Sequence, residues 1–259
     1  MQLYQGDCLE VMKQIPDKSV DMILCDLPYG TTGCAWDIII PFDKLWEQYN
    51  RIIKDNGAIL LFGSEPFSSA LRMSNIKNYK YDWYWEKEKG TGFARSHKQP
   101  MRKIETISVF YKKQPFYDYR GERLDIPQKH ALPIVKSKSD NVSSKNINED
   151  GTRIYIEYNF KTKHNLLRFS RTPRRAEHPT QKPVALMEYL INTYTKENET
   201  VLDNCMGSGT TGVACKHLSR NFIGIELDKN YFDIAKNRIE SEPTQLTLEQ
   251  KEQELDKGE

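Results

Sequence analysis

Thr200-Val201-Leu202-Asp203-Asn204-Cys205-Met206-Gly207-Ser208-Gly209-Thr210-Thr211-Gly212 joins a short apolar run to a glycine-rich turn. We interpret residues 200–203 as a buried strand, and residues 207–220 as a glycine loop followed by a helix. Glycines at such a turn let backbone N–H groups and a ligand approach closely at the carboxyl edge of a parallel sheet. The stretch therefore predicts an α/β fold that binds a nucleotide-like ligand. A tight strand-to-helix turn without a ligand is the plain alternative.

A second strand is predicted over residues 222–226, and it ends at Glu226. A carboxylate at this distance from the loop can hold ribose hydroxyls, and both NAD and S-adenosylmethionine contain such a ribose. An NAD-dependent oxidoreductase is thus one hypothesis. Its fold needs further βαβ units after the loop, however, and only about fifty residues follow here. The partner strands must come from the N-terminal half, so the order of the elements is permuted.

The N-terminal half shows the strand-helix-strand alternation of a parallel sheet. Residues 19–25 form an apolar run that predicts a strand, and residues 42–53 place apolar side chains on one face of a helix. Residues 58–62 form a second buried strand, while residues 81–85 and 107–111 are strand-like segments suited to the far edge of the sheet. We therefore predict an α/β class, with a Rossmann-like, doubly wound and mostly parallel sheet.

Asp26-Leu27-Pro28-Tyr29 ends the first of these strands, at the same sheet edge as the glycine loop. The exocyclic amino nitrogen of adenine or cytosine is a weak nucleophile, because its lone pair is delocalised into the ring. The Asp26 carboxylate and the Leu27 carbonyl, which Pro28 holds in an extended segment, would localise that lone pair and stabilise positive charge on nitrogen. Tyr29 supplies a flat face for a base rotated out of a duplex. In isolation, the four residues would be a simple strand-end turn.

Taken together, these motifs resemble the DNA amino-methyltransferases of phages and bacteria, in the permuted beta arrangement with the catalytic motif first and the cofactor loop last. Asp26-Leu27-Pro28-Tyr29 is similar to the family's Asp-Pro-Pro-Tyr motif, from which Leu27 departs. Residues 203–211 resemble its cofactor loop, and His178-Pro179-Thr180-Gln181-Lys182-Pro183 resembles its cofactor-side segment. The resemblance implies a circularly permuted methyltransferase fold and a site-specific DNA methyltransferase that uses S-adenosylmethionine. Because of Leu27, a catalytically inactive DNA-binding relative stays an alternative.

The resemblance also assigns residues. It implies that Asp7 meets the cofactor's adenine, Glu226 its ribose, and Thr180 with Lys182 its amino-acid end, while an aspartate at position 26 favours N6 of adenine over N4 of cytosine. The predicted catalytic residues are Asp26, Leu27, Pro28 and Tyr29. The predicted cofactor-binding residues are Asp7, Cys8, Asp26, Thr180, Lys182, Asp203, Cys205, Gly207, Ser208, Gly209, Thr210, Thr211, Glu226 and Leu227.

Charge is unevenly distributed along the chain. The formal net charge is only +2, but the segment 98–175 is rich in Lys and Arg and the segment 240–259 is mostly acidic. A basic face suits nucleic acid, although a charge run is more often a solvated surface. Within the basic segment, residues 116–176 lack a long apolar period and predict an irregular, partly mobile target-recognition insertion.

The predicted organisation follows from these segments. A catalytic half at 1–115 precedes the insertion at 116–176, a cofactor-binding half follows at 177–242, and an acidic tail at 243–259 is expected to be disordered. By the resemblance, Lys87 and the Gly90-Thr91-Gly92-Phe93 turn lie where the family shapes its target-base pocket. Trp83 and Trp85 lie in the same region, and core packing is an equal interpretation of them.

Location and partners complete the predictions. No apolar run approaches the roughly 18 residues of a membrane helix and the first residues lack a signal-peptide pattern, so we expect a cytoplasmic protein without membrane contact. The five cysteines contain no Cys-x-x-Cys pair, so neither a disulfide framework nor a metal site is predicted. The expected partner is double-stranded DNA, with RNA as the alternative. The resemblance also admits a homodimer and a cognate restriction enzyme in a restriction-modification system.

Overall fold

The structure, a computed structural model, describes residues 1–31, 37–131, 152, 155–170 and 181–243. The chain divides into two compact units. The main unit comprises Met1–Asp118 and Asn165–Glu259, and the hairpin unit comprises Tyr119–His164.

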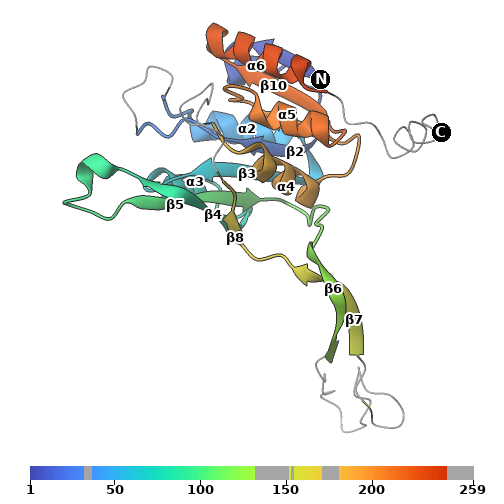
Figure 1. Cartoon of the computed structure of the whole chain (residues 1–259). Helices are drawn as coiled ribbons and strands as arrows, with labels where there is room; N and C mark the ends of the chain where they lie inside the picture. Colours follow the sequence, from blue (N-terminus) through green and yellow to red (C-terminus); the bar gives the residue numbers. More distant parts are fainter. Residues whose placement is uncertain (32–36, 132–151, 153–154, 171–180, 244–259) are drawn as a thin grey trace, which may run out of the picture. The chain divides into compact units, whose positions relative to one another are not determined.

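The main unit is built on a sheet with strand order β1-β10-β9-β2-β3-β5-β4-β8 (Figure 1). The first five strands in this order run parallel: β1 (Gln2–Gln5), β10 (Asn221–Glu226), β9 (Thr200–Asp203), β2 (Val20–Cys25) and β3 (Ile53–Gly63). At the far edge, β5 (Arg102–Phe110) pairs antiparallel with both β3 and β4 (Tyr79–Thr91), and β8 (Leu166–Arg168) pairs parallel with β4. The predicted α/β class with a mostly parallel sheet is confirmed. The late strands β9 and β10 lie between the early strands β1 and β2.

Helices cover both faces of this sheet because buried strands are apolar on both sides. In β2, Ile23 and Cys25 pack with α1 (Cys8–Met12), α2 (Phe42–Ile52) and α3 (Phe67–Ser74). Met22 and Leu24 point to the other face and pack with α4 (Val184–Tyr194), α5 (Thr210–His217) and α6 (Lys229–Ser241). The fold is therefore doubly wound, and the period-2 alternation of β2 divides its core into two layers. None of the helices in these described residues is long and apolar enough to cross a membrane.

The hairpin unit contains two antiparallel strands, β6 (Arg120–Ala131) and β7 (Tyr155–Thr162). This ordered ladder differs from the irregular segment predicted for 116–176. Ile126 is 78% exposed, and Tyr155 and Ile156 are also exposed, so neither strand carries the continuous apolar run that marks a buried strand. The compact unit is also narrower than the predicted insertion, because Leu166–Arg168 belongs to the main sheet. Residues 132–151, 171–180 and the acidic tail at 244–259 lie outside the described residues.

Candidate functional site

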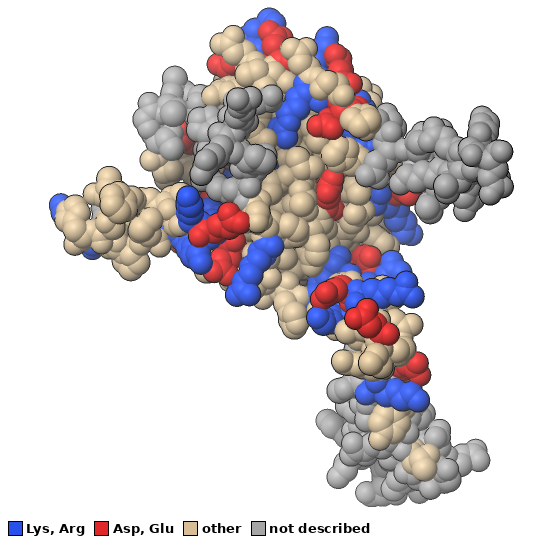
Figure 2. Space-filling model, viewed as in Figure 1, with Lys and Arg blue, Asp and Glu red and all other residues tan. Residues whose placement is uncertain are grey.

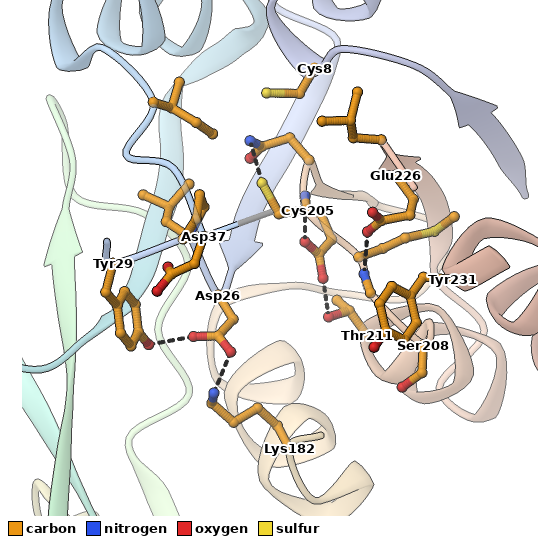
Figure 3. A pocket seen from close by; sticks show the side chains of 18 of the residues that line it. Cys8, Asp26, Tyr29, Asp37, Lys182, Cys205, Ser208, Thr211, Glu226 and Tyr231 are labelled. Carbon is orange, nitrogen blue, oxygen red and sulfur yellow. Dashed lines mark hydrogen bonds and ion pairs between the residues drawn. The ribbon is translucent and has the colours of Figure 1, made fainter. Parts of the chain in front are cut away.

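A cavity of about 590 Å³ lies at the carboxyl ends of four neighbouring parallel strands (Figure 3). Its lining includes Asp7 after β1, Leu227 after β10, Asn204 after β9 and Asp26 after β2. Open α/β sheets bind ligands at this edge, because the loops after successive strands converge there. Asp26, Tyr29 and Lys182 lie on one side of the cavity, and Glu226, Ser208 and Tyr231 on the other. The two predicted motifs thus share one cavity.

The glycine loop after β9 contains two glycines that share a left-handed conformation but differ in what surrounds them. Gly207 and Gly209 have φ angles of +52° and +77°, in the left-handed region that favours glycine. A Cβ on Gly207 would meet nothing within 4 Å, so this glycine leaves open space where the loop faces the cavity. A Cβ on Gly209 would lie 3.0 Å from the Ala235 side chain, so this glycine permits close packing of α6. From α6, Arg238 Nη1 donates to the Ser208 carbonyl at 3.0 Å and fixes the loop.

Two buried carboxylates flank this loop. Glu226 Oε2 accepts from the Gly207 N–H at 2.8 Å, and its Oε1 accepts from the Asp228 N–H at 2.9 Å. Asp203 Oδ2 accepts from the Thr211 hydroxyl at 2.6 Å. Burial raises the pKa of Glu226, and burial raises the pKa of Asp203 to about 6. Asp203 therefore changes its charge close to neutral pH, at a position where the charge would interact with a cationic ligand.

Asp26 is the first residue after β2, and both of its carboxylate oxygens have partners. The Tyr29 hydroxyl donates to Oδ1, and the Lys182 ammonium donates to Oδ2. The Tyr29 ring packs against Phe67, with ring centroids 5.0 Å apart. Burial and the neighbouring Asp26 charge raise the pKa of Tyr29, so it stays a hydroxyl donor. Leu27 is buried with the apolar side chains under α1 to α3, and it is also among the residues that line the cavity.

Asp37 supports the same corner, and the sequence did not single it out. Its two carboxylate oxygens accept from the Gly30 and Thr31 N–H groups, both at 2.8 Å, and its side chain is buried. These bonds hold the backbone directly after Tyr29. The sequence gives no signal for this role of Asp37, because its hydrogen-bond partners come close to it only when the loop is folded.

A row of buried charges continues from Asp26 toward the sheet edge. Lys182 Nζ lies 3.5 Å from Glu105 Oε2 on β5, and Glu105 Oε1 accepts from Lys87 Nζ on β4 at 2.9 Å. Burial would raise the pKa of Glu105, but the two ammonium groups hold it below its usual range. Burial would lower the pKa of Lys182, but Asp26 and Glu105 raise it. Glu105 and Lys182 are therefore held in their charged forms.

Glu105 was missed in the sequence, although a signal exists. It shares one face of β5 with Ile107 and Val109, which are fully buried. An acidic residue in line with buried apolar residues is rarely left unpaired, and it marks a buried ion pair or a site.

The structure brings most of the predicted site residues together. The cavity is lined by Asp7, Cys8, Asp26, Leu27, Pro28, Tyr29, Lys182, Asp203, Cys205, Gly207, Ser208, Thr210, Thr211, Glu226 and Leu227. Gly209 is instead the N-cap of α5, and Thr180 lies outside the described residues. Asp7 also caps α1, since its Oδ1 accepts from the Leu9 N–H at 2.8 Å.

The residues predicted near the target-base pocket lie in three different places: the cavity, the core and the surface. Trp83 is buried in the core and bonds to Tyr194, whereas Trp85 is equally buried but also lines the cavity, as do Lys87 and Thr91. Phe93, at the tip of the β4–β5 turn, is 77% exposed.

Comparison with known proteins identifies relatives over most of the chain. A family model described as DNA methylase, covering N6 and N4 enzymes, matches residues 20–237. The Type II methyltransferase M.HpaI of Haemophilus parainfluenzae is 29% identical over 250 residues, which cover 92% of this chain and 73% of that protein. The Type II methyltransferase M.HinfI of Haemophilus influenzae is 28% identical, over 92% of this chain and 67% of that protein.

Solved structures agree with these relatives. The crystal structure of an M1.HpyAVI–SAM complex has a TM-score of 0.60 at 28% identity, and the match covers 92% of this chain and 98% of that chain. The cytosine-N4-specific PvuII DNA methyltransferase has a TM-score of 0.65 at 16% identity, covering 95% of this chain and 87% of that chain, which is a likeness of fold alone.

Proposed function

The chain belongs to the DNA methylase family, and we propose that it transfers the methyl group of S-adenosylmethionine to N6 of an adenine rotated out of double-stranded DNA. It is a DNA methyltransferase that uses S-adenosylmethionine, so the oxidoreductase hypothesis is set aside. The beta arrangement, the base and the residue roles belong to the proposal. One observation carries these roles: Asp26 and the glycine loop line the same cavity from neighbouring strands.

The cavity suits this cofactor. Gly207 leaves room for close approach, and Glu226, although it accepts two backbone N–H groups, has further lone pairs for ribose hydroxyls. Asp203 offers a carboxylate to a cation, and Asp7 lies beside the same cavity. When bound, S-adenosylmethionine supplies an electrophilic methyl group on a positively charged sulfonium.

The catalytic corner would raise the nucleophilicity of the target nitrogen. The Asp26 carboxylate and the Leu27 carbonyl accept hydrogen bonds from the two amino hydrogens and localise the lone pair. Because positive charge develops on nitrogen during the reaction, a fixed anion beside it stabilises the transition state more than the ground state. Tyr29 orients Asp26 through its hydroxyl. No strong general base is needed, because a methylated aromatic ammonium loses its proton readily.

The hairpin unit is the proposed core of the target-recognition region, residues 116–176. In Figure 2, Lys and Arg side chains are mixed with Asp and Glu along β6 and β7. The basic residues of its described part are Arg120, Arg123, Lys129, Lys161 and Lys163, against the acidic Glu122, Asp125 and Glu157. Exposed pairs such as Lys161 with Glu122, at 2.7 Å, are weak and can exchange for phosphate contacts. A cytoplasmic location, a homodimer and a cognate restriction enzyme belong to the same proposal.

The decisive experiment labels nucleosides. Purified protein is incubated with mixed-sequence double-stranded DNA, and separately with RNA, in the presence of methyl-labelled S-adenosylmethionine, and digested nucleosides are analysed by mass spectrometry. We expect label in N6-methyladenine from DNA. Label in N4-methylcytosine would overturn only the assignment of adenine as the target base. Label in RNA nucleosides would show that the substrate is RNA. DNA binding without any label would show that the protein is a catalytically inactive relative.

Cofactor affinity is expected to depend on pH through Asp203. Burial raises its pKa to about 6 in the free protein, and a cationic ligand favours the ionised form. Below this pKa, binding must release a proton, so affinity falls as pH falls. Titration calorimetry should show S-adenosylmethionine affinity rising roughly tenfold between pH 5 and pH 7 and then levelling.

The dependence should disappear in Asp203→Asn and persist in Asp21→Asn. Asp21 is a matched control because it binds the Thr200 N–H at the opposite end of the same strands. If the affinity of Asp203→Asn depended on pH as steeply as that of the wild type, a group other than Asp203 would be the one that releases the proton on binding.

A further inference from the structure

Both oxygens of the Asp26 carboxylate are occupied in this structure, by Tyr29 and by Lys182. The proposed function needs one of these oxygens to accept a hydrogen from the target amino group. Each oxygen keeps a further lone pair that can accept this hydrogen, so the charge of each partner decides whether it helps or hinders the reaction. Lys182 is the partner that opposes the reaction, since its positive charge would lie beside the positive charge that develops on the target nitrogen.

Lys182 has a second position prepared for it. Its Nζ is 3.5 Å from Glu105 Oε2, which is buried and is the side-chain atom that lacks a hydrogen-bond partner in the described residues. The Phe62 ring lies 5.0 Å from the same nitrogen. A shift toward Glu105 would release Asp26 and give this buried oxygen a hydrogen bond in one movement. Because the Lys182 side chain is only 7% exposed, water is a poor substitute for either carboxylate.

Lys87 fixes the receiving group. Its buried ammonium holds Glu105 Oε1 at 2.9 Å, which leaves Oε2 directed to Lys182. The carboxylates of Asp26 and Glu105 balance the ammonium groups of Lys87 and Lys182. The charge balance is therefore the same before and after the movement, so no proton needs to enter or leave the cavity.

We propose that Lys182 and Glu105 are positioning residues that form a two-position switch, in which Lys182 covers Asp26 in the empty enzyme and moves to Glu105 when the target base arrives. This inference rests on the proposed function and adds a step before methyl transfer. It also differs from the resemblance, which implied that Lys182 holds the amino-acid end of the cofactor.

The test is a single-turnover comparison of variants on DNA that the wild type methylates. In Glu105→Gln, Lys182 has only Asp26 as a charged partner, so the rate should fall roughly tenfold or more while S-adenosylmethionine affinity stays within about twofold. In Glu105→Gln with Lys182→Met, Asp26 is uncovered and the charge is again balanced by Lys87. This double variant should be at least about fivefold faster than Glu105→Gln.

Asp82→Asn is the matched control, because Asp82 is a buried carboxylate on β4 that binds Ser108 of β5 at 2.7 Å and does not line the cavity. It should lower stability without changing the single-turnover rate. A double variant that is no faster than Glu105→Gln would overturn the switch. Loss of cofactor affinity in the double variant alone would instead support the amino-acid-end assignment of Lys182.

A structural experiment tests the position of Lys182 without measuring catalysis. In a crystal of the wild type with sinefungin and a DNA duplex that it binds, Lys182 Nζ should lie within hydrogen-bond distance of Glu105 Oε2 and away from Asp26. Lys182 still bonded to Asp26 beside a flipped base would overturn the switch. A wild type that neither binds DNA nor transfers a methyl group would refute the proposed function itself, which is a different result from any change among the variants.

Discussion

Replacing Asp26 with alanine is expected to slow methyl transfer by a factor of about 10²–10³ while cofactor binding is retained. The change removes the anion and the hydrogen-bond acceptor that face the target nitrogen, and this interaction is strongest in the transition state. Asp26 follows β2 at the cavity, whereas the cofactor loop follows β9, so the loss of the Asp26 side chain leaves Gly207 and Glu226 in place. The measurements are single-turnover methyl transfer to DNA and calorimetric titration of S-adenosylmethionine.

Asp43→Ala serves as the control, since Asp43 is an exposed residue in the first turn of α2. It should behave as the wild type in both measurements. An Asp26→Ala variant that keeps more than about a tenth of the wild-type rate would show that the Leu27 carbonyl and bound geometry carry most of the effect. Loss of cofactor binding would show that Asp26 also serves the cofactor site, which is the second role predicted for it from the sequence.

The parts of the fold that were predictable are those set by local patterns. Ile23 and Leu24 lie in an uninterrupted apolar run, as strands buried on both faces require, and the helix that follows places Leu45 and Tyr49 on its inner face. The carboxyl ends of parallel strands share one edge, so the proximity of Asp26 to the glycine loop could be predicted from the sequence.

The contacts between distant side chains were not predictable. Asp26 and Lys182 are separated by 156 positions, and the pairing of Lys182 with Glu105 depends on how β5 is placed beside β3. No local period encodes such pairs. The hairpin was missed for a different reason: a two-stranded ladder with exposed faces is held by backbone hydrogen bonds, and these leave no apolar signature in the sequence.

Removing the hairpin unit is expected to cut DNA affinity by a factor of about 10³ or more without affecting the cofactor. The Lys163 N–H donates to the Tyr119 carbonyl at 3.2 Å, so the two ends of this unit are adjacent and a short Gly-Ser linker can replace residues 120–162. The eight-stranded sheet of the main unit contains neither β6 nor β7. Folding and S-adenosylmethionine affinity should therefore persist, and circular dichroism and calorimetry measure these two properties. Fluorescence anisotropy at fixed salt concentration measures the loss of DNA affinity.

A milder variant separates charge from shape in the same unit. Arg123→Gln with Lys129→Gln keeps β6 and β7 but removes two cations, and it should weaken DNA binding similarly for all sequences and flatten its salt dependence. If the linker variant instead bound and methylated DNA as the wild type does, target choice would have to lie in the main unit. The exposed turn at Phe93 would then be the first place to look, because Thr91, the last residue of β4 before that turn, lines the cavity.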